Sequence, residues 1–320
     1  MIKTPTVSVI IPTYNRAHLI GKAVKSVLNQ TYQDFEIIVV DDGSTDNTEE
    51  VMKSFNNFKI RYICHSDNRG ISVARNIGIR ASRGEYIALL DSDDEWLPEK
   101  LDKQVDVLQN ESPEVGVVCS WSYNIDEKGN YISKRCLPKK GGYIYEDLLS
   151  TNPISVPTVL IRKECFNRVS LFDDLLNAQE DWDMWIRIAK YYRFALIKVP
   201  LVKYRKHSDQ ISKNPREKII TANRILVKYV NELKKRPRAH SKHYFYIGNR
   251  LCHMGKTKEG QRYLIKAISL YPFCIRYYIC MFGSLFGPKC FIYFVNIKRY
   301  LTRAMVKYIG KIRKTTLNSL

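Results

Sequence analysis

The stretch Gly84-Glu85-Tyr86-Ile87-Ala88-Leu89-Leu90-Asp91-Ser92-Asp93-Asp94 joins an apolar run, typical of a buried strand, to three carboxylates within four residues. Asp91 and Asp93 point to the same side of an extended segment, because side chains alternate with a period of two. Carboxylates this close repel one another, and a hard divalent cation that bridges to an anion such as a diphosphate offsets that repulsion. The alternative is an acidic turn that caps a helix beginning near Pro98.

The segments on either side of this stretch alternate between strand and helix patterns. Apolar runs at 7–11, 35–40, 60–63 and 86–90 indicate buried strands, and apolar residues at helical spacing follow within 19–28, 48–52, 72–81 and 97–108. Further strands are expected at 115–121, 156–161 and 194–198, and a helix at 181–191. This alternation predicts an α/β fold, with a mostly parallel sheet that helices cover on both faces.

Three polar clusters follow strands of the predicted sheet: Pro12-Thr13-Tyr14, Asp41-Asp42 and Asp91-Ser92-Asp93-Asp94. In sheets of this kind ligands bind at the carboxyl ends of the strands, so we expect the three clusters to form one site. No glycine-rich phosphate loop of either common type is present. Its absence argues against a nucleotidyltransferase, which would need such a loop near the first strand.

The charge of +20 on the 320 residues is unevenly distributed. Residues 1–212 hold 28 Lys and Arg against 29 Asp and Glu, whereas residues 213–320 hold 24 against 3. From about Asn214 the pattern is entirely helical, and Gly255 to Pro272 resembles the second half of a tetratricopeptide-type helix pair. We therefore expect a domain over 1–212 and a basic helical appendage over 213–320.

The eight cysteines are scattered and form no C-x-x-C pair, which indicates neither a zinc site nor a redox motif. Reduced thiols and an N-terminus without a signal-peptide pattern favour a cytoplasmic protein.

Six short motifs occur in an order that resembles one enzyme family. They are Pro12-Thr13-Tyr14-Asn15-Arg16, Val40-Asp41-Asp42-Gly43-Ser44-Thr45-Asp46, Ala74-Arg75-Asn76-Ile77-Gly78, Gly84-Glu85-Tyr86, Leu90-Asp91-Ser92-Asp93-Asp94 and Glu180-Asp181-Trp182. Over about residues 5–212 the chain resembles the family-2 inverting glycosyltransferases, which have the GT-A, Rossmann-like nucleotide-sugar-binding fold. Each motif is weak alone, but the six together are specific.

The resemblance implies which residues bind the donor. Pro12, Tyr14 and Asp42 would line the pocket of the base, where a carboxylate that only accepts hydrogen bonds suits a uracil imide. Arg75 would clasp the diphosphate, and Asp91 would contact the sugar or ribose. The alternatives are a turn with a helix cap at Asp41-Asp42-Gly43-Ser44 and a surface ion pair for Arg75.

The resemblance also implies a metal site and a catalytic base. Asp93 and Asp94 would bind Mn²⁺ or Mg²⁺, and His207 in the segment Tyr204 to Ser212 would reach the metal or the diphosphate. Asp181, paired with Glu180, would take the proton from the acceptor hydroxyl. The alternatives are a structural histidine and acids that favour the first turn of a helix.

The basic region 213–320 has three interpretations. It binds an anionic membrane surface, it packs on the catalytic domain with solvated lysines, or it binds nucleic acid. The segments 277–288 and 290–297 lack charged residues but are too short to span a bilayer, so an interfacial pair of helices on the inner face of the cell membrane is favoured. Nucleic acid is disfavoured because residues 1–212 are nearly neutral.

The resemblance implies an inverting, metal-dependent transferase. It would move a sugar from a nucleotide-diphosphate donor, with UDP favoured, to a hydroxyl of a glycan or a lipid-linked acceptor. The rival from another class is a catalytically inactive glycan-binding or scaffold protein on the same fold. Such a protein should lack an acid of the metal run or Asp181, and all of these acids are present.

Overall fold

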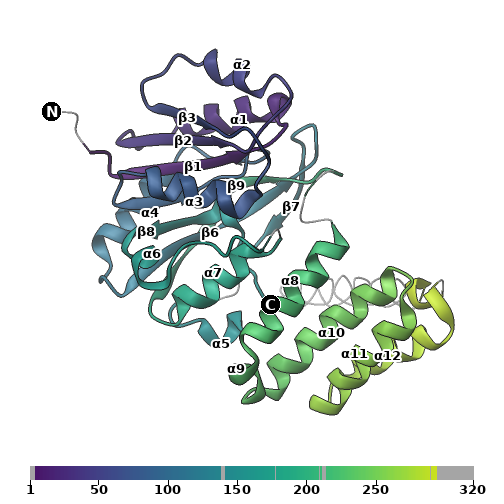
Figure 1. Ribbon diagram of the computed structural model, residues 1–320. Coiled ribbons are helices and arrows are strands. Elements are labelled where there is room, and N and C mark those ends of the chain that lie inside the picture. The colour runs from purple at the N-terminus through teal and green to yellow at the C-terminus, as the bar shows by residue number, and fades with distance from the viewer. Residues whose placement is uncertain are drawn as a thin grey trace, which may run out of the picture. The chain divides into compact units, whose positions relative to one another are not determined.

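The computed structural model describes residues 4–137, 141–176, 178–208, 210, 214–288 and 290–293 (Figure 1). The chain divides into two compact units, one ending at Asn214 and the other beginning at Pro215. The first unit contains strands and helices, and the described part of the second contains only helices. The predicted domain boundary after Ser212 lies outside the described residues.

The strands of the first unit form one mixed sheet in the order β3-β2-β1-β4-β8-β6-β9-β5, with β7 paired to β6. Its elements in chain order are β1 (Val7–Thr13), α1 (Ala17–Leu28), β2 (Phe35–Asp41), α2 (Thr48–Lys53), β3 (Ile60–Cys64), α3 (Ile71–Ala81), β4 (Tyr86–Leu89), β5 (Glu95–Trp96), α4 (Lys100–Asn110), β6 (Val115–Ile125), β7 (Tyr131–Arg135), α5 (Tyr145–Leu148), the 3₁₀ turn η1 (Val156–Thr158), β8 (Val159–Arg162), α6 (Glu164–Val169), α7 (Glu180–Ala189) and β9 (Arg193–Arg205).

The strands run parallel in one half of the sheet and in mixed directions in the other. Strands β3, β2, β1 and β4 are parallel, β8 is antiparallel to both of its neighbours, and β9 is parallel to β6. The α/β fold with helices flanking the sheet is confirmed. The parallel arrangement expected from the alternating pattern describes the β3-β2-β1-β4 half.

The two faces of the parallel half are covered by different helices, because successive side chains of a strand point to opposite faces. Ile37 and Val39 of β2 pack in one large core with the buried side of α1, including Val24. Ile38 and Val40 instead pack with α3. Burial of both faces explains why these strands read as continuous apolar runs.

Strand β9 is longer than the segment 194–198 that the sequence indicated. It continues through Pro200 to Arg205 and pairs with β6 throughout. Proline is tolerated in a strand at an irregularity of the ladder, and the register shifts beside the Trp121–Pro200 pair. This extension carries β9 to the acidic loop after β4.

The second unit contains α8 (Pro215–Lys228), α9 (Val230–Lys234), α10 (Pro237–His253), α11 (Thr257–Leu270) and α12 (Ile275–Leu285). Helices α10 and α11 approach closely at two glycines: a Cβ added to Gly260 would lie 2.8 Å from the carbonyl oxygen of Gly248. The helical appendage expected from the sequence is confirmed. Within the described residues, every helix is too short or too polar to cross a lipid bilayer.

Candidate active site

Three polar segments leave the sheet at the same edge. In the parallel ladder Thr13 is the partner of Asp41, and the backbone N–H of Leu90 donates to the carbonyl oxygen of Ile10 at 3.0 Å. The chain therefore continues past β1, β2 and β4 at the carboxyl end of all three strands. Ligands of α/β sheets bind at this edge.

The three aspartates after β4 form a compact cluster. One carboxylate oxygen from each of Asp91, Asp93 and Asp94 lies within 4.8 Å of the other two. Asp94 is 1% exposed; its Oδ1 accepts the backbone N–H of Arg205 at 2.7 Å, and its Oδ2 has no hydrogen-bond partner among the residues that the structure describes. Burial and the neighbouring carboxylates of Asp93 and Asp91 raise the pKa of Asp94 well above its ordinary range.

A histidine completes this cluster. His207 is 7% exposed, and its Nε2 lies 2.7 Å from Oδ2 of Asp93. Carboxylate oxygens with one imidazole nitrogen form a ligand set that suits Mg²⁺ or Mn²⁺. The unpartnered Oδ2 of Asp94 is an acceptor that such a cation would satisfy, so the residues present fit a divalent metal ion.

Arg205, at the end of β9, holds the acidic loop in place. Its Nε donates to the carbonyl oxygen of Asp93 at 3.0 Å, and its guanidinium also reaches the carbonyl oxygens of Asp126 and Glu127 and the carboxylate of Glu95. The side chain is 1% exposed. Five donors in a rigid fork allow one buried arginine to fix several backbone segments at once.

Arg75 links the acidic loop to the start of α7. The guanidinium is 1% exposed; it donates through Nη2 to Oδ1 of Asp91 at 2.7 Å and through Nη1 to Glu180. Burial raises the pKa of Asp91, while the Arg75 cation acts in the opposite direction. Arg75 therefore bridges two carboxylates that lie 89 positions apart in the sequence.

Asp181 lies beside this ion pair and is half-buried. Its Oδ2 accepts a hydrogen bond from Nδ2 of Asn152 at 3.0 Å, and its Oδ1 accepts the backbone N–H of Trp182 at 2.8 Å. Burial and the adjacent Glu180 carboxylate raise the pKa of Asp181 to about 7, with Arg75 opposing them. A carboxylate with a pKa near the working pH is suited to general base catalysis.

The residues predicted to bind the base lie around the end of β2. Asp41 accepts the backbone N–H of Ser44 at 2.8 Å and so closes the turn, whereas both oxygens of Asp42 face the loop before α3. Asp42 accepts the backbone N–H groups of Arg69 at 3.0 Å and Gly70 at 2.7 Å.

The other predicted base-pocket residues belong to the end of β1. Tyr14 is 44% exposed, and Pro12 is buried within the strand. The ring of Tyr14 is therefore accessible to a planar ligand, and the contact with a base stays a prediction.

Sequence reasoning missed two residues of this site. Asn152 lies in an irregular segment and has no periodicity or motif that marks it. Arg205 stands two positions before His207, yet its contacts with residues 93–95 depend on the long course of β9. The spatial pairing of β9 with β5 and β6 reveals the contacts of Arg205, and the fold reveals that of Asn152 by bringing it next to Asp181.

Comparison with known proteins places this arrangement in a family. The Glycosyl transferase family 2 model matches residues 8–176. An uncharacterized glycosyltransferase of Rickettsia bellii is 35% identical over 210 residues, a match that spans 65% of this chain but only 30% of that relative's length. The UDP-Glc:alpha-D-GlcNAc-diphosphoundecaprenol beta-1,3-glucosyltransferase WfgD of Escherichia coli is 32% identical, with 65% of this chain and 80% of the relative covered.

Solved structures agree with the fold. TarS residues 1–349 of S. aureus in complex with UDP-GlcNAc superimposes with a TM-score of 0.63 at 19% identity, with 83% of this chain and 80% of that chain covered. The mannosyltransferase PcManGT of Pyrobaculum calidifontis, in complex with GDP-Man and Mn²⁺, gives 0.56 at 20% identity, with 84% and 74% covered. From its family-model match and these relatives, the chain belongs to glycosyl transferase family 2.

Proposed function

We propose that the protein transfers a single sugar from a UDP-sugar to a hydroxyl group of a glycan or lipid-linked acceptor, with inversion at the anomeric carbon. The observation that carries the proposal is the pairing of two acidic groups at one edge of the sheet. One is the aspartate cluster with its unpartnered Asp94 Oδ2, and the other is Asp181 with its pKa of about 7. The UDP donor is supported by the WfgD relative, whose name specifies UDP-Glc.

The acidic cluster is the donor side of the site. Asp93, Asp94 and His207 would hold Mn²⁺ or Mg²⁺, which offsets the negative charge on the departing diphosphate. Arg205 holds the loop by donating from Nε to the carbonyl oxygen of Asp93 and from its backbone N–H to Oδ1 of Asp94. Tyr14 and Asp42 would bind the base, and Asp91 would contact the sugar or ribose.

Asp181 is the acceptor side of the site. A single displacement with inversion needs one base, which removes the proton from the attacking hydroxyl group. Asn152 and the backbone N–H of Trp182 each hold one oxygen of Asp181, so the carboxylate has a fixed orientation. Glu180 is held by Arg75 and contributes by raising the pKa of its neighbour.

Arg75 acts as a charge partner for both sides. Its two contacts to Asp91 and Glu180 occupy Nη1 and Nη2, and its buried Nε has no hydrogen-bond partner among the described residues. The diphosphate contact that the sequence implies for Arg75 stays a prediction. The contacts to Asp91 and Glu180 support a second role for Arg75, which is to hold the acidic loop after β4 in a fixed position relative to helix α7.

The second unit is proposed to bind an anionic membrane surface. Residues 215–288 carry 15 Lys and Arg against 3 Asp and Glu. Helix α12 exposes a row of apolar side chains at helical spacing, while Tyr277 and Cys280 are buried on its other side. The row consists of Ile275 (72% exposed), Tyr278 (41%), Phe282 (52%), Leu285 (60%) and Phe286 (57%).

This row, called the α12 face below, fits an interfacial helix whose apolar side chains enter the lipid headgroup region. The basic residues of the same unit would add electrostatic attraction. The sequence-based prediction of an apolar stretch reaching Ile297 extends beyond Tyr293, so its last four residues lie outside the described residues.

The function is tested with a panel of nucleotide sugars and the full chain in the presence of Mn²⁺. Many transferases slowly hydrolyse their donor when no acceptor is present, so release of UDP from one UDP-sugar identifies the donor without knowledge of the acceptor. We expect hydrolysis of a UDP-sugar that depends on the divalent cation. Equal UDP affinity with and without Mn²⁺ would contradict the metal role.

A further inference from the structure

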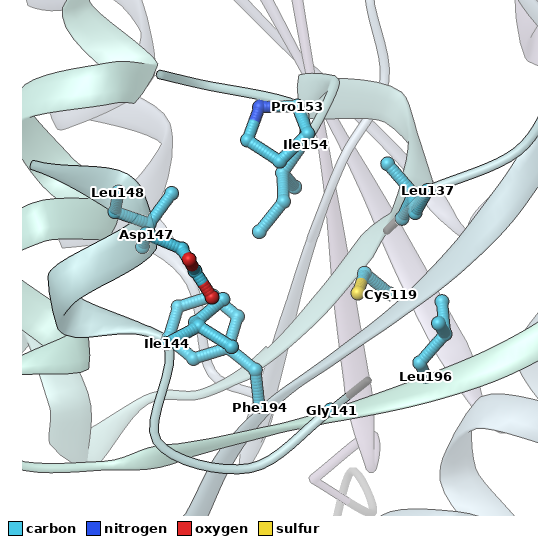
Figure 2. A pocket seen from close by; sticks show the side chains of 10 residues that line it. All are labelled: Cys119, Leu137, Gly141, Ile144, Asp147, Leu148, Pro153, Ile154, Phe194 and Leu196. Carbon is cyan, nitrogen blue, oxygen red and sulfur yellow. The ribbon is translucent and has the colours of Figure 1, made fainter. Parts of the chain in front are cut away.

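A pocket with mostly apolar walls lies in the first unit beside α5 (Figure 2). Seven of its ten lining residues have hydrocarbon side chains, and the one charged lining group is the carboxylate of Asp147. The empty space is about 390 Å³ with the open mouth included. That figure includes open solvent; the space within the pocket itself is about 30 Å³, well below the roughly 300–1,000 Å³ of pockets that hold a whole ligand, so the pocket suits one small substituent.

One short segment connects this pocket to the catalytic base. Pro153 and Ile154 form part of the wall, and the preceding Asn152 donates from Nδ2 to Asp181 Oδ2 at 3.0 Å. The same Asn152 side chain accepts the backbone N–H of Ile154 through Oδ1 at 3.0 Å. A group bound in the pocket therefore touches a wall that is hydrogen-bonded to the residue that orients the base.

The pocket is preorganised on its other sides. Gly142 and Phe194 exchange two backbone hydrogen bonds, of 2.7 and 3.0 Å, which fix the segment before α5 to β9. A Cβ added to Gly141 would lie 2.5 Å from the carbonyl oxygen of Phe194, so this approach requires glycine. The Pro153 carbonyl oxygen accepts a hydrogen bond from Arg135 at 2.9 Å.

The chemistry of the lining selects one kind of substituent. Asp147 extends from α5 into the pocket and, within the described part of the chain, its carboxylate has no hydrogen-bond or ion-pair partner (Figure 2). A carboxylate accepts hydrogen bonds and repels anions, while the walls favour hydrocarbon. Among common sugar substituents, a hydroxyl group offers no hydrocarbon, and a deoxy methyl or O-acetyl group offers no donor.

An acetamido group has both an N–H donor and a methyl group, and it is small enough for the pocket. We propose that this pocket binds the acetamido group of an amino sugar in the acceptor, an inference that rests on the proposed transferase function. The bound acetamido would place its sugar against the segment 152–154 and so set the position of the acceptor hydroxyl relative to Asp181.

The inference is tested by binding, using the methyl glycosides of N-acetylglucosamine and glucose as probes. Saturation-transfer NMR on the full chain with UDP and Mn²⁺ should show the strongest saturation at the acetyl methyl protons. Affinity for the glucose glycoside should be at least about tenfold weaker, because a hydrogen bond to a charged group and the apolar contact are both lost. Equal binding of the two glycosides would overturn the proposal.

Two variants locate the bound group. Ile144→Trp, at a half-buried position of the lining, should fill the pocket and remove the acetyl methyl signal. Asp147→Ala should weaken binding of the N-acetylated probe about tenfold and leave the glucose glycoside unchanged. The matched control is Glu146→Ala, which removes the exposed neighbouring carboxylate outside the lining and should change neither probe. Survival of the methyl signal in both pocket variants refutes the inference.

These outcomes are separable from a failure of the transferase function. Binding of UDP and hydrolysis of a UDP-sugar test the donor side and do not involve the pocket. A chain that passes both donor tests but has no preference for the N-acetylated probe keeps its proposed function and loses this inference. A chain that fails both donor tests contradicts the function, whatever sugar it binds.

Discussion

The two units of the chain carry their charges in opposite ways. The first unit is nearly neutral in sum, yet Lys100, Arg75 and Arg205 are each at most 1% exposed. In the second unit, no lysine or arginine within 215–288 is buried. Buried charges must be paired or neutralised, so they have fixed partners and fixed geometry, whereas exposed charges act mainly through long-range attraction.

This difference indicates how each unit should respond to perturbation. Removing one buried charge in the first unit leaves its partner without compensation, so single substitutions should have large effects on chemistry or stability. In the second unit each charge contributes little, and effects should be additive and sensitive to salt.

The largest effect is expected at the proposed metal site. Asp93→Ala removes a carboxylate that contacts His207 and should reduce transfer by about 10³-fold or more, since a metal contributes several kcal/mol of charge stabilisation. Binding of UDP should lose its dependence on Mn²⁺, as measured by calorimetry. The control is Asp102→Ala, at an exposed position of α4, which should leave both quantities unchanged.

The next largest effect is expected at Asp181, the proposed catalytic base. Asp181→Asn keeps the shape of the side chain but cannot accept the proton, so kcat should fall by about 10²–10⁴-fold while UDP affinity barely changes. In the parent, kcat should fall as the pH decreases through about 7, because the protonated carboxyl group is inactive. If Asp181→Asn keeps the parental kcat, the base lies elsewhere, and Glu180 becomes the first candidate.

The sequence predicts the parallel half of the fold and much of the site for physical reasons. Strands buried on both faces appear as apolar runs, and acids directly after such a run stand out because they oppose its pattern. Long-range pairings leave no such local signal. The contact between Arg75 and Glu180 joins residues 105 positions apart, and that between Arg205 and Glu95 joins residues 110 apart. The role of Asn152 depends in the same way on a contact across 29 residues.

Arg75→Met tests whether the buried ion pairs hold the first unit together. The substitution leaves Asp91 and Glu180 without their cation and should lower the free energy of unfolding by about 3–5 kcal/mol. Denaturant unfolding measures this loss. Loss of the cation should also raise the pKa of Asp181, so the acidic limb of the kcat profile should move to higher pH.

The matched control for this prediction is Arg80→Met, at an exposed position of the same helix α3. A surface substitution should change the free energy of unfolding by no more than about 0.5 kcal/mol. Equal effects of the two substitutions would show that the ion pairs of Arg75 contribute no net stability.

Lys100 should have a smaller effect on the free energy of unfolding, and this effect should depend on pH. Its Nζ is buried against Gln104 Oε1 at 2.6 Å and the Trp96 ring at 3.9 Å, and burial lowers its pKa well below the ordinary value. Between the folded and the unfolded pKa of Lys100, the unfolded chain therefore binds more protons than the folded chain does. Stability from this group should decrease as the pH falls below the unfolded pKa, by at most about 1.4 kcal/mol per pH unit.

Lys100→Met should remove this component from the pH dependence of the free energy of unfolding. Comparison of denaturant unfolding of the parent and the variant between pH 6 and pH 10 measures it. The variant should gain stability relative to the parent towards the acidic end. Parallel curves for the two proteins would show that Lys100 has the same protonation state in the folded and unfolded chain.

The smallest effects are expected on the α12 face. The full chain should sediment with vesicles that contain anionic lipid, and rising salt should release part of it because the basic residues are screened. The double substitution Phe282→Ser and Phe286→Ser removes two exposed rings and should weaken vesicle binding by roughly tenfold while leaving its salt dependence intact. Val227→Ser, at a 72% exposed apolar position of α8, should have no effect. If the parent ignores anionic vesicles at low salt, the exposed charges of the second unit serve another partner; if Val227→Ser weakens binding as much as the double substitution, the contact is not localised to α12.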